Sequence, residues 1–550
     1  MTAPSQPRRI DAMRRETRIV IFVSSLAALG ANLPYVFAPL LAPPGHRFMG
    51  HVFNPDEPNV YLAWIRQHAE GSLLAKDPFT TEGPQVGFFN LFLFALGVLS
   101  ALLRLDPIWL WHASRVVGCF ALVASAWALS RRALSHPLAW RLSLWLVSFG
   151  SGLGWLQALG VPLDSTDYRP RLLGLITPET VNFLSMLVNP LFSLSISLEL
   201  LALSFWLDAL KSGRPRGALK PGLVLLLLGN IHTYDLAALL PAIALHAMLV
   251  SALRRSFRPL LIALVACGLC LPSIGLQFVV FLLDPVFREK ALTPTSVPPL
   301  GTILNTLGLP LLGAVAGGIL GLAKSERREE VLLLVLWPIC ALLSAHLPVS
   351  FQRKALEGVQ CALALLSAQG LAVLLASARE RGPGPLRVAR LAVFMFVALC
   401  APSNALFLAD VFRNLSENNA LLRPALMPRF YLSRGQVEAA KFIGRIRGEA
   451  DVALSSPTYA NYLPRLSGVT VFAGHWAETL RYPEKVRIIP LLYSKGAPNS
   501  WRLAFLKAHR IRFVLYGPEE REYGFDSPSE GGWARLVARF GDTEVYEVER

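Results

Sequence analysis

Two adjacent acidic residues, Asp56 and Glu57, have the type and spacing needed for proton-transfer chemistry. Pro55 and Pro58 flank the pair, and proline restricts the backbone of its own residue and of the residue before it. A carboxylate presented in such a stiff corner could act as a general base and remove a proton from a hydroxyl group. We expect a helix to begin at Pro58. The alternative interpretation is that Asp56 or Glu57 only caps that helix.

Polar residues also occur in the turn of an apolar hairpin that is too short for the membrane. Residues 221 to 253 supply about 50 Å of helix at about 1.5 Å per residue, whereas two full crossings need about 60 Å. The turn should therefore lie below the outer surface, where His232, Tyr234 and Asp235 would line a cavity. Alternatively, His232 and Asp235 form a self-satisfied pair that only joins two helices.

Arg353 and Lys354 form a cationic pair at the expected outer end of an apolar run, where positive charge is uncommon. Such a pair suits an anionic headgroup or a lipid phosphate, although ordinary solvation of the two side chains is the alternative. Asp167, in another outer loop, is a further cavity-lining candidate. No metal-ligand cluster is visible in the sequence, but a divalent cation could bridge Asp56 with Asp167 or Asp235.

These residues are carried by a chain that is too apolar for a soluble protein. Of its 550 residues, 53% are hydrophobic and only 16% are charged, which indicates a mostly α, polytopic membrane protein. The net charge of +16 comes from short basic clusters between apolar runs, which is where the signals for membrane orientation occur. Nucleic-acid binding is therefore not expected.

The basic clusters predict the topology. Residues 1–18 would be a cytoplasmic N-terminus, and the first span would lead into an acidic outer loop at 43–106. The apolar run at 87–103 should lie at the outer interface, because a crossing there would place Arg131 and Arg132 outside and invert every later loop. With the first span included, about eleven spans are expected: 19–42, 107–130, 138–160, 183–210, 221–233, 236–253, 259–283, 301–323, 331–347, 356–377 and 389–410.

The transmembrane domain is thus expected over residues 19–410, followed by a small extracytoplasmic α/β domain at 411–550. DVALSS, VTVFAG, IRFVLYG and TEVYEVE read as strands, whereas GQVEAAKFIGRI, SWRLAFLKAH and GWARLVARF read as helices. The densest polar and aromatic cluster of this domain is His475, Trp476 and Glu478. It could contact a ligand or only structure a loop.

The arrangement resembles the GT-C superfamily of integral membrane glycosyltransferases. The matching features are the first span, the acidic outer loop with Asp56 and Glu57, two interfacial helices at about 58–70 and 87–103, and many later spans. The protein mannosyltransferase branch has a similar adjacent Asp and Glu. The resemblance implies an integral protein of the cell membrane that takes a sugar from a polyprenyl-phosphate donor and transfers it outside the cytoplasm.

In such an enzyme Asp56 would be the base, Glu57 would assist it, and Arg353 with Lys354 would hold the donor phosphate. A single base and direct displacement would invert the anomeric centre. The acceptor could be a protein, a lipid or a polysaccharide. Two other functions stay open: a lipid or solute transporter or flippase that uses His232, Asp235 and Glu199 as an ion relay, and a catalytically inactive scaffold of the same fold.

Overall fold

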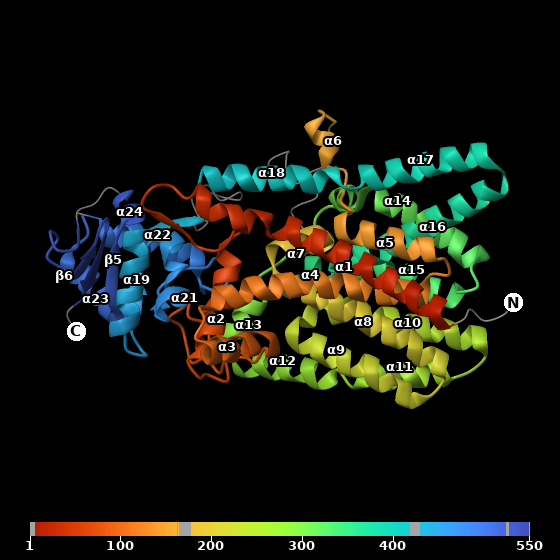
Figure 1. Cartoon of the computed structure of the whole chain (residues 1–550). Helices are drawn as coiled ribbons and strands as arrows, with labels where there is room; N and C mark the ends of the chain where they lie inside the picture. Colours follow the sequence, from red (N-terminus) through yellow and green to blue (C-terminus); the bar gives the residue numbers. More distant parts are fainter. Residues whose placement is uncertain are drawn as a thin grey trace. The chain divides into compact units, whose positions relative to one another are not determined.

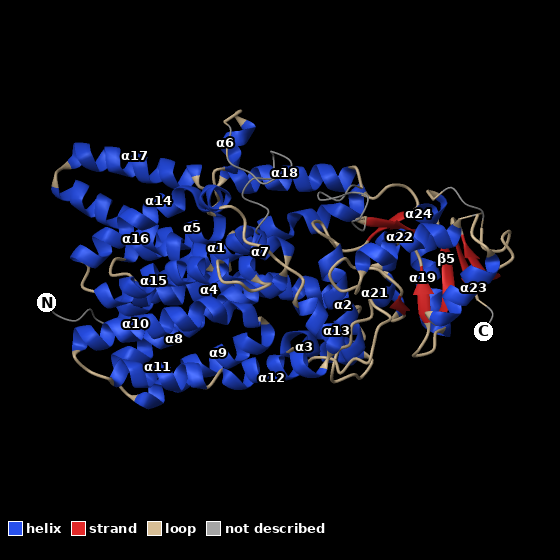
Figure 2. Ribbon diagram, turned by 180° about the vertical axis from the view of Figure 1, so that it is seen from behind, coloured by secondary structure: helices blue, strands red, loops and turns tan. Residues whose placement is uncertain are grey.

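The computed structural model describes residues 6–161, 163, 178–418, 429–494, 496–523 and 527–548. Helices dominate it, and the described strands other than β1 (His46–Phe48) lie in the C-terminal part of the chain (Figure 2). The expected class, a mostly α membrane protein with a small α/β part, is therefore confirmed.

The chain divides into two compact units. One, called here the helical unit, comprises Met1–Leu33, His112–Leu276 and Pro294–Ala409. The other, called the mixed unit, comprises Pro34–Trp111, Gln277–Thr293 and Asp410–Arg550. The first outer loop and the C-terminal segment thus belong to the same compact unit, although more than 300 residues separate them in the sequence.

Seven described stretches are long and apolar enough to cross a membrane, or eight if the bent pair α11 (Arg258–Gly268) and α12 (Leu271–Leu283) is one span. The seven are Arg14–Leu41 with most of α1 (Gln6–Phe37), α4 (Pro107–Ala133), α8 (Pro190–Ser212), Thr233–Arg254 with α10 (Leu236–Arg254), α14 (Leu300–Lys324), Gln352–Glu380 with α16 (Val359–Glu380), and Pro383–Ser416 with α17 (Pro383–Leu399) and α18 (Pro402–Ser416).

The expected number of about eleven is higher than this count because it includes three further segments. Two of them, α5 (Pro137–Phe149) and α9 (Leu219–Ile231), have 13 residues each, or about 20 Å of helix. The third, α15 (Arg328–Ala345), has 18 residues but begins with three charged ones. The run at 87–103 contains α3 (Leu91–Leu103), whose 13 residues are likewise shorter than a full crossing.

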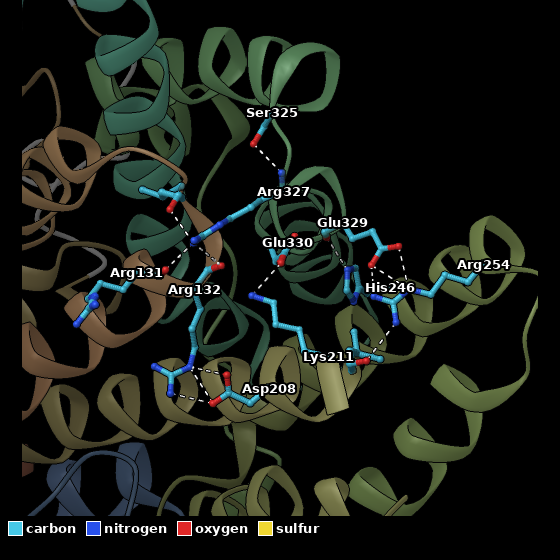
Figure 3. Close-up of polar contacts among 12 residues, drawn as sticks. Arg131, Arg132, Asp208, Lys211, His246, Arg254, Ser325, Arg327, Glu329 and Glu330 are labelled. Carbon is cyan, nitrogen blue, oxygen red and sulfur yellow. Dashed lines mark hydrogen bonds and ion pairs between the residues drawn. The ribbon is translucent and has the colours of Figure 1, made fainter. Parts of the chain in front are cut away.

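Charged side chains from several of the basic loops meet within the helical unit (Figure 3). Arg327 donates hydrogen bonds to the backbone carbonyl oxygens of Arg131 and Arg132. The ion pairs are Arg131–Glu16, Arg132–Asp208, Lys211–Glu330 and Arg254–Glu329. The predicted topology places these loops on one side of the membrane, and their contacts with one another agree with that prediction. Which side that is stays a prediction.

The mixed unit contains the α/β domain and two short strands that join it to the first outer loop. β1 (His46–Phe48) pairs antiparallel with β2 (Tyr431–Ser433). The main sheet has the order β4-β3-β5-β7-β6, in which β3 (Val452–Leu454), β4 (Thr470–Val471) and β5 (Ile511–Tyr516) are parallel. β6 (Arg535–Phe540) and β7 (Thr543–Glu547) complete it as an antiparallel hairpin. Figure 1 labels β5 and β6 of this sheet.

The helices of this domain include α19 (Arg434–Ile446), α21 (Leu463–Ser467), α22 (Tyr482–Tyr493) and α23 (Asn499–Ala508). The prediction of a helix in GWARLVARF was wrong, since its last six residues form β6. Gly541 has φ +57° and allows a tight turn that returns the chain as β7. Pairing with β7 satisfies the backbone of this segment and overrides its apparent helical spacing.

One face of the sheet and the first outer loop share a hydrophobic core. From the loop, α2 (Asp56–Ala69) contributes Val60, Trp64 and Ile65, and α3 contributes Leu93 and Leu96. The sheet and its flanking helices contribute Val437, Ala440, Tyr459, Phe513 and Val545. Burial of these apolar surfaces fixes α2, and with it Asp56, against the C-terminal domain.

Candidate functional site

The acidic pair lies in the first turn of α2, two residues earlier than the expected helix start. Pro55 is the N-cap, and Asp56 is the first helical residue. Glu57 is helical although it precedes Pro58, and a residue before proline usually avoids the helical region. Pro58 falls where a helix leaves its N–H groups unpaired, so its missing donor costs nothing, and two acids suit the positive end of the helix dipole.

Asp56 has the environment of a proton acceptor. Its side chain is only 2% exposed, and Oδ1 accepts a hydrogen bond of 2.8 Å from the backbone N–H of Glu57. Oδ2 accepts no hydrogen bond from any described residue. Burial, together with the neighbouring negative charge of Glu57, raises the pKa of Asp56 to about 7. A base with such a pKa is well matched to proton transfer near neutral pH.

His475, from the segment after β4, faces the free oxygen of this carboxylate. Its Nε2 lies 3.6 Å from Asp56 Oδ2. Its Nδ1 accepts hydrogen bonds from the backbone N–H groups of Ala477 at 3.2 Å and Glu478 at 3.1 Å. Burial lowers the pKa of His475 to about 4, so the ring is neutral at pH 7. Because Nδ1 is the acceptor, the one ring proton is on Nε2 and points toward Asp56.

Trp476 completes this group. Its ring stacks on that of His475 with centroids 6.0 Å apart, its side chain favours the ionised form of Asp56, and 47% of it is exposed. The cluster that the sequence singled out is therefore both a structured loop and a neighbour of the acidic pair. The sequence showed its density of polar and aromatic residues but not its proximity to Asp56.

A buried polar network holds α2 in place behind the acidic pair. Arg465, on α21, donates from one Nη1 to the carbonyl oxygen of Met49 at 2.7 Å and to Asn59 Oδ1 at 3.0 Å. Asn59 donates in turn to Asn461 Oδ1 at 2.7 Å. Asn59 follows Asp56 by three residues and therefore shares its helix face. These bonds restrict rotation of that face.

Three further ionisable residues of the mixed unit lie near His475. The Lys290 ammonium forms an ion pair with Glu478 and lies 4.4 Å from the centre of the Trp64 ring. Burial and the charge of Glu478 raise the pKa of Asp77 well above its usual range. Sequence reasoning did not identify Asp77 as a site residue. A small pocket beside them is lined by Trp64, Asp77, Gln85, Phe88, Asp284 and Lys290.

The helical unit brings four of the other candidates together. His232 and Tyr234 lie in the turn between α9 and α10, which contains the short helix η5 (Thr233–Asp235). His232 Nδ1 is 2.8 Å from Asp235 Oδ1, and the His232 and Tyr234 rings are in edge contact with centroids 5.5 Å apart. Lys354, on η6 (Gln352–Leu356), holds its ammonium 4.4 Å from the centre of the Tyr234 ring.

Arg353 has a different environment. Its Nη2 donates to Glu179 Oε1 at 3.2 Å, and its backbone N–H donates to the carbonyl oxygen of Thr295. The charge of Arg353 is therefore already paired with Glu179. Asp167 lies outside the described residues. Asp56 and Glu57 belong to the mixed unit, whereas the other described candidates belong to the helical unit.

Two buried acids extend the His232 group. Glu357 Oε2 lies 3.5 Å from His232 Nδ1, and Oε1 accepts a bond of 2.5 Å from the Ser195 hydroxyl. Glu199, within the span α8, acts electrostatically on both Asp235 and Glu357. The sequence marked Glu199 as an acid in need of a partner, but Glu357 was missed. Its position immediately before an apolar run and near two cations was the available signal.

No protein-family model matches the sequence, and no curated protein matches it. Solved structures do match. The Archaeoglobus fulgidus oligosaccharyltransferase has a TM-score of 0.53 and 13% identity, over 90% of this chain and 69% of that one. The mycobacterial arabinofuranosyltransferase AftD, as the R1389S mutant, has a TM-score of 0.59 and 13% identity, over 97% of this chain but only 42% of that one.

ArnT from Cupriavidus metallidurans, bound to undecaprenyl phosphate, is comparable in length. The match covers 96% of this chain and 97% of ArnT, with 14% identity and a TM-score of 0.50. At these identities the likeness concerns the fold. The chain accordingly has the GT-C fold.

Proposed function

We propose that this protein is a membrane glycosyltransferase that moves a sugar from a polyprenyl-phosphate donor to an acceptor hydroxyl on the extracytoplasmic side. The observation that carries the proposal is the buried carboxylate of Asp56, whose pKa of about 7 and unbonded Oδ2 suit a general base. The GT-C fold supports a transferase. Two matched structures contain a polyprenyl phosphate, which supports a lipid-linked donor. ArnT is bound to undecaprenyl phosphate, and the Archaeoglobus fulgidus oligosaccharyltransferase, AglB, is in complex with a dolichol phosphate.

In the proposed reaction, Asp56 Oδ2 accepts the proton of the acceptor hydroxyl as that oxygen bonds to the anomeric carbon. The bond between the anomeric carbon and the phosphate oxygen breaks, and the polyprenyl phosphate leaves with the electron pair. The proton then passes from Asp56 to solvent. Displacement in one step inverts the anomeric centre, since retention would require a carboxylate nucleophile and a covalent intermediate.

Glu57 and Lys354 have supporting roles in this scheme. Glu57 accepts a hydrogen bond of 3.0 Å from the Tyr61 hydroxyl, and its remaining acceptor positions can orient the acceptor substrate. Lys354 supplies positive charge for the departing phosphate, with Arg353 contributing once its ion pair with Glu179 opens. The exposed ring of Trp476 offers a flat apolar surface beside the base for one of the substrates.

His475 is a positioning residue. The two backbone N–H groups that bind Nδ1 keep the proton on Nε2, so the ring can only donate toward Asp56. A neutral donor favours the ionised carboxylate without adding a positive charge that would weaken it as a base.

The proposal is tested by transfer or donor cleavage with purified protein in lipid nanodiscs. Polyprenyl phosphates that carry different labelled sugars are incubated with the wild type, Asp56→Asn and Asp106→Asn. Asp106 is a matched control because it lies in the same outer loop, is exposed, and accepts a hydrogen bond from the backbone N–H of Ile108. We expect release of polyprenyl phosphate by the wild type and by Asp106→Asn, with the opposite anomer in the product.

Two results would contradict the proposal. If no polyprenyl-phosphate sugar in the panel is cleaved by the wild type, the donor class is wrong. If the donor is cleaved equally by Asp56→Asn, another group is the base.

A further inference from the structure

Three buried acidic side chains lie around His232 in the helical unit, and some of their carboxylate oxygens have no hydrogen-bond partner among the described residues. Asp235 is 1% exposed, Glu357 is 1% exposed and Glu199 is 0% exposed. Asp235 Oδ2, Glu357 Oε2 and both carboxylate oxygens of Glu199 accept no hydrogen bond from the described chain. A buried carboxylate in this state loses its hydration without replacement, which is costly.

The charges of this group do not balance. Three ionised carboxylates contribute three negative charges, and Lys354, which acts electrostatically on Asp235, returns one positive charge. An imidazole that ligates a metal is neutral, so His232 as a ligand adds none. The cluster is therefore two positive charges short of neutrality, and a divalent cation would supply both.

The distances fit such an ion. One ring nitrogen of His232, one carboxylate oxygen of Asp235 and one of Glu357 all lie within 4.8 Å of one another. Ligands on opposite sides of an ion bound at about 2.1–2.4 Å are at most about 4.2–4.8 Å apart, so the three atoms can share one ion after small side-chain adjustments.

The ligands also come from elements that hold them in place. His232 and Asp235 are three residues apart in one tight turn, and Glu357 directly precedes Gly358 at the start of α16. Gly358 has φ +73°, and a Cβ there would collide with Glu199. Glycine thus allows Glu199 to approach the backbone beside Glu357, which keeps the third carboxylate near the ligands.

We propose that His232, Asp235 and Glu357 bind a divalent metal ion in the helical unit, with Glu199 balancing its charge. One imidazole and two carboxylates suit Mn²⁺ or Zn²⁺ better than Ca²⁺, which prefers six to eight oxygen ligands. The site contains neither Asp56 nor Asp167, so it differs from the bridging cation considered from the sequence. It does not depend on the proposed sugar transfer.

The test uses Mn²⁺ as the probe and the full-length protein in nanodiscs. The protein is treated with EDTA, exchanged into metal-free buffer and titrated with Mn²⁺, while electron paramagnetic resonance reports the free ion. Glu357→Gln and His232→Gln remove one ligand each. Glu329→Gln is the matched control, because Glu329 is a carboxylate of the same unit that pairs with Arg254 and is 29% exposed.

We expect the wild type and Glu329→Gln to bind one Mn²⁺ per chain, with a higher melting temperature than after EDTA treatment. Each ligand variant should bind at least about tenfold more weakly, since even the loss of an outer-shell partner typically costs about 10–100-fold in affinity. The metal should not raise the melting temperature of either variant.

A wild type that binds no Mn²⁺ or Zn²⁺ overturns the proposal, since the carboxylates are then neutralised by protons. Equal binding by the wild type and both ligand variants also overturns it, because the ion then lies elsewhere. If one variant does not fold, the other variant and the wild-type titration still decide the question.

Discussion

Replacement of Asp56 by Asn tests whether its carboxylate removes a proton or only caps α2. Asn keeps the size and much of the hydrogen bonding of Asp but cannot accept the proton. A general base typically contributes about 100-fold to 10,000-fold, so transfer should fall by at least about two orders of magnitude. Donor affinity should change much less, because the base acts mainly in the transition state.

The same substitution should stabilise the protein. The pKa of Asp56 is about 7 in the folded protein against 3.8 for an ordinary aspartate, and at about 1.36 kcal/mol per pH unit this corresponds to about 4 kcal/mol. Because the folded-state pKa is the higher one, wild-type stability falls as pH rises from about 3.8 to about 7. Asn carries no charge and avoids this loss.

The two effects are measured on the same samples. Transfer is followed at pH 8 for the wild type, Asp56→Asn and the control Asp106→Asn, and melting temperatures are recorded between pH 5 and pH 8. We expect the melting temperature of Asp56→Asn to exceed that of the wild type by an amount that grows toward pH 7. Near-normal transfer together with an unchanged melting temperature would refute the argument, since that is the result expected of a simple cap.

Other predictions concern the remaining candidates. His475→Phe should slow transfer and shift the rising limb of the pH–rate profile to higher pH, because Asp56 loses an N–H group that favours its charged form. His475→Gln keeps an N–H group and should shift the limb less. Identical pH–rate profiles would remove the positioning role. Lys354→Ala should weaken donor binding more than Arg353→Ala, as measured with a labelled polyprenyl phosphate, and equal affinity in all three proteins would place the phosphate elsewhere. A cysteine introduced at the exposed position Glu449 should react with an impermeant reagent added outside the cell. A cysteine at the exposed position Ser212 should react only after permeabilisation. The reverse pattern would invert the topology.

The fold class could be predicted from the sequence because it depends on local properties. Apolar runs of membrane length predict the spans, and basic loops predict how the spans are connected. The alternation of strand and helix patterns predicts the α/β domain. The number of spans was less accurate. Short helices such as α5 and α9 look like spans in a hydropathy pattern, but their length is decided by where packing and turns end them.

Strand β6 is a second case in which tertiary contacts decided the structure. Its sequence has apolar residues at helical spacing, yet pairing with β7 across the turn at Gly541 makes it a strand. The same applies to the start of α2. The rule that a residue before proline avoids the helical region did not hold, because the first turn of a helix tolerates the missing N–H of Pro58.

The sequence by itself determined which residues could do chemistry: an acidic pair beside prolines, an ionisable turn in a short hairpin, a cationic pair, and a polar cluster at His475. Only the tertiary structure decided which of them meet. Asp56 acquires its pKa from burial against a segment about 400 residues away, and Glu357 becomes part of the His232 group by the packing of η6 on η5. Proton affinity and metal affinity depend on burial and on distances of a few ångströms, and neither quantity is encoded in local sequence spacing.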